Sequence, residues 1–474
     1  MELEIRNVEF ASSLFRTRIP FRFGIVTLVE APVIVARVRV RAGDSEFTGH
    51  SADLTVPKWF DKNPATSASE DIRALFASAE RARSGFASLR GTAFDIWREA
   101  YARCVVGDLA SDVALVNGFG VALVERAMLD ATCRAANVSF REALLRDVFG
   151  FDAGALLSET AGITSAELVA AETPASVLVR HTVGGLDPLR SSEVPEELSG
   201  DDGHPVALEE DIRRFGLRAF KLKAGGEPAA DVRRLAEIAR VVEEHAPSGP
   251  LYTLDANEQY PDLAELGNLL DALENDPDGR GLLEKLAYVE QPLPRAQTLD
   301  PSSADGVRAI AASIPLLIDE ADDSPDAFQR AFAIGYRGVS VKNCKGVFRA
   351  LANRALCLTK GEGAFQTSED LTNLPVAPLQ QDLTTLATLG LSHSERNGHH
   401  FFPGLDVVPE AEAESALAAQ PDLYERSDSG RITLAIRDGA LSLDCQHARG
   451  YGIASEIEFE ARAGLDQVAK ELRG

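Results

Sequence analysis

Lysine and carboxylate side chains recur at the ends of short apolar runs in the middle of the chain. The run Ala219–Lys223 contains Lys221 and Lys223, which share one face of a predicted strand because side chains alternate sides along it. Burial and mutual repulsion both lower a lysine's pKa, so the pair predicts a proton acceptor near neutral pH. Taken alone, the pair also fits an exposed edge strand with two solvated lysines.

The next four apolar runs favour the functional interpretation, because each ends in a charged residue. Asp255, Glu290 and Asp319 end three consecutive predicted strands, and Lys342 ends the next. A single carboxylate after a strand is commonly a helix cap, but capping does not explain three in a row between lysines. Carboxylates that converge need a compensating cation, and three oxygen ligands with open positions suit Mg²⁺. The pattern therefore predicts a magnesium site flanked by lysines.

From about residue 170 the pattern alternates strand and helix, which predicts an α/β fold. The eight expected strands are Ser176–Val183, Ala219–Lys223, Leu251–Asp255, Leu286–Glu290, Leu316–Asp319, Gly338–Lys342, Ala364–Ser368 and Leu391–Glu395. Eight such units over this length predict a (β/α)₈ barrel, which places its chemistry at the carboxyl ends of the strands. An open doubly wound sheet also alternates, but no G-x-G-x-x-G follows any strand.

The two ends of the chain lack this alternation and predict an α+β capping domain. Near the N-terminus we expect strands at Val8–Leu14, Phe21–Leu28 and Val33–Val40 and helices at Ser69–Ala82, Ala93–Cys104 and Ala114–Ala136. In the tail we expect strands at Ile432–Ile436, Ala440–Leu443 and Glu456–Phe459. The predicted division is residues 1–165 for the N-terminal capping segment, 166–418 for the barrel and 419–474 for a tail that completes the capping domain.

Composition excludes several classes of partner. The formal net charge of −25 argues against a nucleic acid or an anionic membrane surface, since either needs a basic face. No apolar stretch is long enough to span a bilayer, and the N-terminus has no run of signal-peptide type. Five dispersed cysteines without a C-x-x-C motif fit reduced thiols. We therefore expect a cytoplasmic protein that acts on a small molecule, and a homo-oligomer.

Together the charged motifs resemble those of the enolase superfamily, with the lysine pattern of its muconate-lactonising group within the mandelate racemase/muconate lactonizing enzyme type. The matching motifs are Lys221-Leu-Lys223, Asp255-Ala-Asn257, Val-Glu290-Gln-Pro, Ile-Asp319-Glu and Val-Lys342-Asn-Cys-Lys345. The resemblance implies one Mg²⁺ on Asp255, Glu290 and Asp319, and an acid/base pair formed by Lys223 and Lys342. It also implies that Lys221 and Asn257 support these groups. Such an enzyme removes the proton α to a substrate carboxylate, and Mg²⁺ stabilises the resulting enolate.

The resemblance also implies that loops of the capping domain close over the barrel and contact the distal part of the substrate. We therefore expect Arg22 and Phe23, in the arginine-rich segment Arg16–Gly24, to bind substrate, and Gly49–Asp53 to form a second such loop. At the eighth strand, Glu395 and His399 are further candidate substrate contacts. His393, His399 and His400 could instead make a zinc site, although the sequence shows no further ligand at a suitable spacing.

Fold and half-reaction follow from these motifs, but the substrate does not. The first interpretation is a racemase or epimerase that uses both lysines on a small carboxylate. The second is a lyase, such as an acid-sugar dehydratase or a syn-eliminating synthase, or a cycloisomerase. The third is a barrel retained as a binding protein. The Asp-x-Asp motif with which dipeptide epimerases bind a substrate ammonium is missing after the eighth strand, which argues against that particular substrate.

Overall fold

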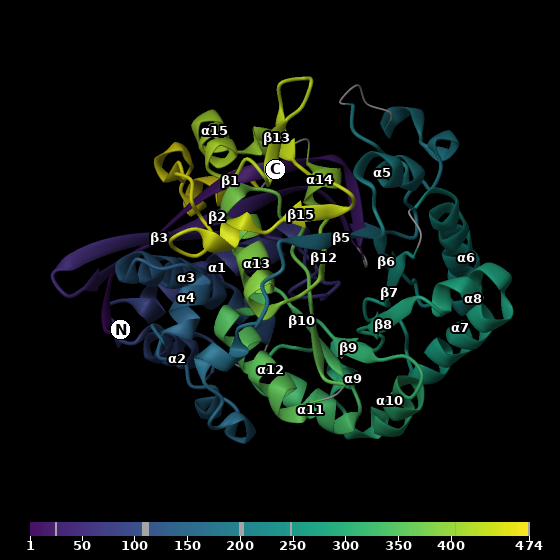
Figure 1. Ribbon diagram of the computed structural model, residues 1–474, viewed down its shortest axis with the longest axis horizontal. Helices are drawn as coiled ribbons and strands as arrows, with labels where there is room; N and C mark the ends of the chain where they lie inside the picture. The colour runs from purple at the N-terminus through teal and green to yellow at the C-terminus, as the bar shows by residue number, and fades with distance from the viewer. Residues whose placement is uncertain are drawn as a thin grey trace.

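The computed structural model describes residues 1–23, 26–106, 113–198, 203–246, 249–361, 363–402 and 404–472. Its centre is a closed parallel barrel, in which each strand pairs with the next along the chain and the last pairs with the first (Figure 1). The barrel strands are β5 (Ser176–Val183), β6 (Ala219–Lys223), β7 (Leu251–Asp255), β8 (Leu286–Glu290), β9 (Leu316–Ile318), β10 (Gly338–Val341), β11 (Phe365–Ser368) and β12 (His393–Glu395). The predicted (β/α)₈ barrel is confirmed.

Helices surround the barrel on its outside, as the ring of teal and green ribbons in Figure 1 shows. They are α5 (Leu208–Phe215), α6 (Pro228–His245), α7 (Leu263–Asn275), α8 (Pro277–Leu283), α9 (Arg295–Thr298), α10 (Ala304–Ala311), α11 (Ala327–Ile334), α12 (Val347–Lys360), α13 (Val376–Leu389) and α14 (Gly398–Phe401). Local sequence fixes several ends. The side chain of Asp262 caps the start of α7, and Gly390 ends α13 in a left-handed conformation that glycine adopts without strain.

The N-terminal segment forms a separate antiparallel sheet covered by helices. The sheet order is β3 (Ser45–Leu54), β2 (Val26–Ala42), β1 (Leu3–Phe23) and β4 (Arg90–Gly91). The helices are α1 (Ala68–Phe86), α2 (Ala93–Cys104), α3 (Ala114–Ala136) and the short α4 (Phe140–Leu145). Helix α3 packs across β2 and β3, so its nearly continuous apolar sequence is buried. This unit confirms the predicted α+β capping domain.

One predicted strand of this domain is wrong. The run Phe21–Leu28 is predicted to be a single strand, but its first three residues belong to β1 and its last three to β2, and Phe21 pairs with Leu28 across the two strands. Apolar residues occur on both strands, so the sequence pattern alone does not separate β1 from β2. Residues 16–23 of the arginine-rich segment consequently belong to β1 and do not form a separate loop.

The C-terminal tail contacts both parts of the molecule. It contains α15 (Glu410–Ala419), β13 (Tyr424–Arg426), β14 (Ile432–Leu434), β15 (Ala440–Ser442) and α16 (Leu465–Glu471). Strand β15 pairs antiparallel with the barrel strand β5, whereas Ala463 bridges to Ser12 of β1. The predicted strand Glu456–Phe459 is not formed. The domain boundaries themselves remain a prediction.

Among the helices that the structure describes, none combines the length and the apolar character that a membrane-spanning segment requires.

Candidate active site

Strand register brings the charged strand ends to one level of the barrel. Lys223 pairs with Asp255 on the neighbouring strand, and Asp255 pairs with Glu290 on the strand after that. Asp319 directly follows β9, and Lys342 directly follows β10. Because all these strands run in parallel, their carboxyl ends lie at the same mouth of the barrel. The structure thus brings together the six residues predicted as catalytic or metal-binding.

The Lys221 side chain lies at the centre of this group and is buried. Its Nζ is 2.7 Å from Glu395 Oε2, 2.9 Å from Glu290 Oε1, and 3.0 Å from both Asp255 Oδ2 and Glu369 Oε2. One ammonium therefore contacts carboxylates from four different strand ends. Lys221 acts as a hub that holds these carboxylates in place, in keeping with the supporting role that the sequence implied.

Lys223 and Lys342 border a single cavity from different strands. Lys223 Nζ contacts Asp255 Oδ2 at 2.5 Å, and its side chain is 15% exposed. Lys342 Nζ lies 3.0 Å from Asp319 Oδ2 and 3.0 Å from Glu369 Oε2. The cavity is lined by Phe21, Val56, Trp59, Lys221, Lys223, Asp255, Asn257, Asp319, Lys342, Glu369, Asp370, Leu371, Thr372 and Glu395.

The pKa values of the lysines differ from the sequence-based expectation. Burial acts to lower the pKa of Lys223, but the carboxylates of Asp255, Glu395 and Glu290 together raise it above its ordinary value. At Lys342, burial also acts to lower the pKa. The carboxylates of Asp319 and Glu369 act in the opposite direction, and the pKa is raised well above its ordinary value. The predicted lowering of the lysine pKa values is therefore wrong for this charge state of the site. The neighbouring carboxylates have a larger effect on these pKa values than the second lysine has.

Three carboxylates form a cluster with the composition of a divalent-cation site. Single oxygens of Glu290, Asp319 and Glu369 lie within 4.8 Å of one another, and all three residues are buried. Glu290 Oε2 and Glu369 Oε1 have no hydrogen-bond partner among the described residues. Burial, followed by the charges of Asp255 and Glu369, raises the pKa of Glu290 well above its ordinary value. Buried oxygens without donors fit a hard cation such as Mg²⁺.

The cluster overlaps the predicted ligand set without matching it. Glu290 and Asp319 belong to both sets, whereas Glu369 takes the place expected for Asp255. Asp255 is connected to the cluster through Lys221, whose Nζ contacts both Asp255 and Glu290. From sequence alone, Glu369 at the end of the seventh predicted strand fits either a substrate contact or a helix cap. Glu369 joins the cluster only because the barrel closes. The sequence of a single strand does not show which other strand ends it will meet.

Asn257 and Glu395, two predicted substrate contacts, line the cavity but are held by protein groups. Asn257 adopts a left-handed backbone with φ of 46°, and its carbonyl and Oδ1 accept hydrogen bonds from Lys62. Glu395 accepts hydrogen bonds from Lys221, from Thr182 Oγ at 2.5 Å and from Asn397 Nδ2 at 3.0 Å. Both residues shape the wall of the cavity, and their contact with substrate remains a prediction.

Of the other three predicted substrate contacts, Arg22 and His399 border other cavities. Arg22 borders a neighbouring cavity that also reaches Lys223 and Asn257. The backbone of Phe23 ends β1, but its side chain lies outside the described part of the chain. His399 borders a different cavity, where its ring packs edge-on against Phe215 at 5.0 Å. His399 is therefore not among the described residues that line the lysine-bordered cavity.

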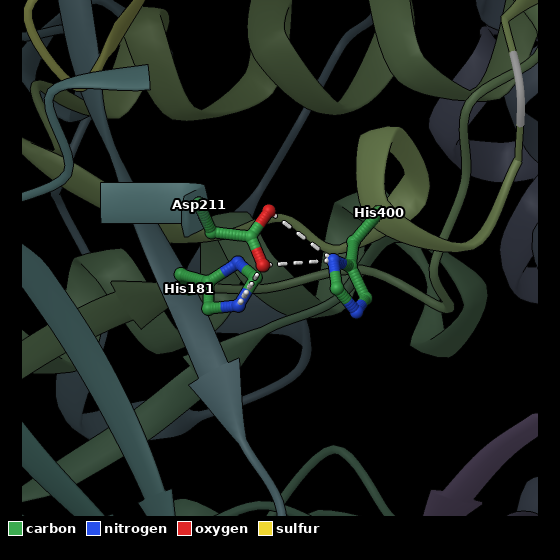
Figure 2. Close-up of side chains that lie close together, drawn as sticks. All are labelled: His181, Asp211 and His400. Atoms are coloured by element: carbon green, nitrogen blue, oxygen red, sulfur yellow. Dashed lines mark hydrogen bonds and ion pairs between the residues drawn. The ribbon is translucent and has the colours of Figure 1, made fainter. Parts of the chain in front are cut away.

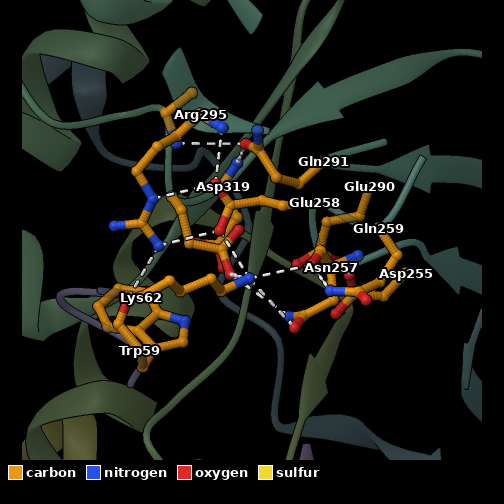
Figure 3. Close-up of polar contacts among 12 residues, drawn as sticks. Trp59, Lys62, Asp255, Asn257, Glu258, Gln259, Glu290, Gln291, Arg295 and Asp319 are labelled. Carbon is orange, nitrogen blue, oxygen red and sulfur yellow. Dashed lines mark hydrogen bonds and ion pairs between the residues drawn. The ribbon is translucent and has the colours of Figure 1, made fainter. Parts of the chain in front are cut away.

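Two segments of the capping domain reach the cavity: Phe21, from the first predicted segment, lines it, and a further segment follows the second predicted one. Gly49–Asp53 lies within β3, and Asp53 is buried against Arg126 and Asn373. The covering segment follows that strand and includes Trp59 and Lys62, and Figure 3 shows the Lys62 side chain extending toward Asn257 and Glu258.

Two cations attach the covering segment to the barrel. Lys62 Nζ contacts Glu258 Oε2 at 2.6 Å and Glu320 Oε1 at 3.6 Å. Arg295 donates hydrogen bonds to the backbone carbonyls of Trp59 and Phe60, each at 3.0 Å, and forms an ion pair with Glu258 (Figure 3). The Trp59 ring then lies 4.2 Å from Lys342 Nζ, a cation–π contact. Sequence reasoning missed Trp59 and Lys62, because neither belongs to a strand end.

Comparisons with known proteins agree with this geometry. Residues 206–371 match the family model described as enolase C-terminal domain-like, of the mandelate racemase/muconate lactonizing enzyme type. None of the curated proteins matches the sequence. Residues 206–371 include the barrel strands β6 to β11, so this part of the chain is similar to the C-terminal domain of that type.

Solved structures of low sequence identity share the whole fold. An enolase from Bradyrhizobium, complexed with magnesium and mandelic acid, is 16% identical with a TM-score of 0.57, over 96% of this chain and 97% of that one. A muconate lactonizing enzyme from Pseudomonas fluorescens, complexed with muconolactone, is 16% identical with a TM-score of 0.58, over 96% and 97%. A dipeptide epimerase from Enterococcus faecalis V583, complexed with Mg and L-Leu-L-Tyr, is 14% identical with a TM-score of 0.54, over 84% and 92%.

Proposed function

We propose that the protein is a Mg²⁺-dependent racemase or epimerase that removes and returns the proton α to the carboxylate of a small molecule. The observation that carries this proposal is the placement of Lys223 and Lys342 on one cavity, with a buried carboxylate cluster beside both. The lysines belong to different strand ends, so their ammonium groups approach a bound molecule from different directions.

The carboxylates supply the ligands for the ion. Glu290 and Asp319 would hold it, together with Glu369 or Asp255. Bound there, Mg²⁺ supplies positive charge to the substrate carboxylate and to the negative charge that develops when the α-proton leaves. Enolase-fold proteins complexed with magnesium and mandelic acid, or with Mg and a dipeptide, are consistent with this assignment.

The two lysines carry the proton. Each Nζ is held by a carboxylate of the site, Lys223 by Asp255 and Lys342 by Asp319 and Glu369. These carboxylates favour the ammonium form of each lysine. When a cation neutralises the carboxylate charge, this effect weakens and the lysine loses its proton more easily. A neutral Nζ accepts the α-proton on one face, and the opposite ammonium donates a proton to the other face.

The cavity wall indicates the substituent on the α-carbon. Phe21, Val56, Trp59 and Leu371 form its apolar part. The charged lining residues are already engaged with one another, as the ion pairs of Lys221 show. An α-substituted carboxylate with an apolar or aromatic group fits this lining better than a sugar acid, whose hydroxyl groups would lose their hydrogen bonds with water.

The test is deuterium exchange at the α-carbon. The protein is incubated with Mg²⁺ in D₂O and a panel of mandelate-like acids, acylated amino acids, dipeptides and sugar acids, and NMR follows the α-proton. We expect the α-proton signal of an apolar-substituted acid to disappear while both stereoisomers form. A keto or unsaturated product would instead identify a lyase. Magnesium binding with no exchange across the panel would contradict the proposal.

A further inference from the structure

A second cluster of metal-ligating side chains lies outside the barrel interior. Along β5, Thr182 points inward and donates a hydrogen bond to Glu395, so the neighbouring His181 points outward, toward α5. There it meets Asp211, in the first turn of α5, and His400, on α14. Figure 2 shows the three side chains directed toward one another. Residues from three separate elements therefore converge behind the wall of the active site.

The three ligand atoms lie within 4.8 Å of one another, and the two distances to Asp211 fit one shared metal ion. His400 Nδ1 lies 3.1 Å from Asp211 Oδ2, and His181 Nε2 lies 3.9 Å from the same oxygen. Zinc binds imidazole nitrogen and carboxylate oxygen at roughly 2.0–2.2 Å, so two ligand atoms of one ion lie no more than about 4.2 Å apart. Both distances are below that limit without any movement of the side chains.

The cluster is buried, and contacts within the protein do not satisfy it. The side chains of His181, Asp211 and His400 are 5%, 1% and 8% exposed. His181 Nε2 is too far from Asp211 for a hydrogen bond, and Nδ1 of the same ring has no partner among the described residues. An ordinary His–Asp pair explains the contact between His400 and Asp211. It does not explain His181, whose ring points toward the Asp211 carboxylate without forming a hydrogen bond to it. Such buried polar atoms are rare unless an ion or water completes them.

We propose that His181, Asp211 and His400 bind a zinc ion. Two imidazole nitrogens and one carboxylate are a typical zinc ligand set, whereas Mg²⁺ prefers oxygen ligands alone. The sequence had suggested zinc on His393, His399 and His400, and the structure changes two of these ligands. His393 lies inside the barrel with its Nδ1 2.5 Å from the Arg180 guanidinium, and His399 is not part of the cluster.

The ion would fix the segment that contacts the capping domain. His400 and Phe401 are adjacent, and the Phe401 ring packs against Phe21 of the β1 hairpin with centroids 4.2 Å apart. Arg18 of the same hairpin donates a hydrogen bond to the His400 carbonyl at 2.7 Å. Zinc would therefore join α14 to α5 and β5 and stabilise the base on which the hairpin rests. Phe21 itself lines the active-site cavity.

Zinc binding is tested with Zn²⁺ alone as the probe. The full chain is stripped with a chelator, equilibrated with Zn²⁺ in the presence of excess Mg²⁺, gel-filtered and analysed for metal. We expect one tightly retained zinc per chain in the wild type and in Glu290→Gln, whose carboxylate belongs to the active-site cluster. We expect loss of that zinc in His400→Ala and in the isosteric Asp211→Asn. His447→Ala removes an exposed histidine outside the cluster and should keep the zinc.

A second measurement uses only the wild type, so it does not depend on the folding of a variant. X-ray absorption at the zinc edge should show imidazole scattering together with nitrogen or oxygen ligands at about 2.0–2.2 Å. Zinc that is not retained by the wild type, or that both cluster variants retain, would overturn the proposal. A spectrum without imidazole ligands would overturn it equally. Loss of zinc in Glu290→Gln alone would assign the ion to the active site and also refute the second site.

Discussion

At the level of single residues, the barrel mouth is defined by an excess of buried carboxylate over nearby ammonium groups. Lys221 contacts four carboxylates at once, and Glu290 still keeps one oxygen without a donor. Protonation of Glu290 is one way to relieve this crowding, as its raised pKa indicates. A divalent cation is the other way, and it is the one that has a use in proton abstraction.

The first prediction concerns the ligands of that cation. Glu290→Gln removes the charge that both candidate ligand sets share, so Mg²⁺ affinity should fall by more than the roughly 10–100-fold typical of an outer-shell partner. Titration calorimetry measures the loss, and Glu284→Gln, an exposed site, serves as the control. Parallel titrations of Glu369→Gln and Asp255→Asn identify the third ligand. Unchanged affinity in Glu290→Gln would refute the magnesium assignment.

At the level of elements, the segment after β3 is held over the barrel by ion pairs and backbone hydrogen bonds. Arg295, at the start of α9, contacts two backbone carbonyls of the segment and the Glu258 carboxylate. Its side chain is 22% exposed and that of Glu258 is 6% exposed, so removal of the arginine leaves a nearly buried charge with Lys62 alone. The segment is therefore a fixed wall of the cavity and not a freely moving lid.

The second prediction tests this attachment. Arg295→Ala should lower the free energy of unfolding by about 2–4 kcal/mol, slightly less than for a fully buried ion pair. It should also expose Trp59, which iodide quenching would detect as increased accessibility in a Trp97→Phe background. Arg280→Ala removes an exposed pair with Glu274 and should cost less than about 1 kcal/mol. Equal unfolding curves for the two variants would contradict the role of Arg295.

At the level of the whole molecule, buried neutral histidines make the fold sensitive to acid. Burial and the adjacent Arg180 lower the pKa of His393 to about 3, below the ordinary value of 6.5. The unfolded chain takes up a proton below pH 6.5 while the folded protein does not, so stability is complete above pH 6.5 and is lost as the pH falls toward 3.

The third prediction follows from that sign. Between pH 7.5 and pH 5, urea unfolding of the wild type should lose about 1–2 kcal/mol through His393 alone. His393→Gln should be less stable at pH 7.5 but should lose correspondingly less on acidification, because its side chain takes up no proton. The exposed His447→Gln should follow the wild-type profile. An identical pH dependence in His393→Gln would contradict the assigned cause.

The sequence specifies the barrel of this molecule more completely than its active site. The strand ends at Lys223, Asp255 and Glu290 agree with the predicted ones, because an apolar run followed by a charge marks both the strand and its carboxyl end. Glu369 and Trp59 could not be assigned from sequence, since their roles depend on barrel closure and on a contact between domains. The raised lysine pKa values were missed for the same reason. Three-dimensional convergence decides which charges dominate.

The histidines show the same limit. The sequence placed His400 with its neighbours in the chain, whereas in the structure it contacts Asp211 of α5 and lies beside His181 of β5. No spacing rule connects residues so far apart in the chain. Only the closure of the barrel between its first and last strands brings them together.

The most direct test of the central claim is stereospecific exchange in lysine variants. Lys223→Ala and Lys342→Ala are each incubated with Mg²⁺ in D₂O and with each pure stereoisomer of the substrate that the panel identifies. Two-base catalysis predicts that each variant loses exchange of one stereoisomer, by about 10²–10⁴-fold, and keeps exchange of the other. Lys285→Ala, a surface lysine paired with Glu243, should exchange both. If either Lys223 or Lys342 is dispensable for both stereoisomers, two-base racemisation at this site is wrong.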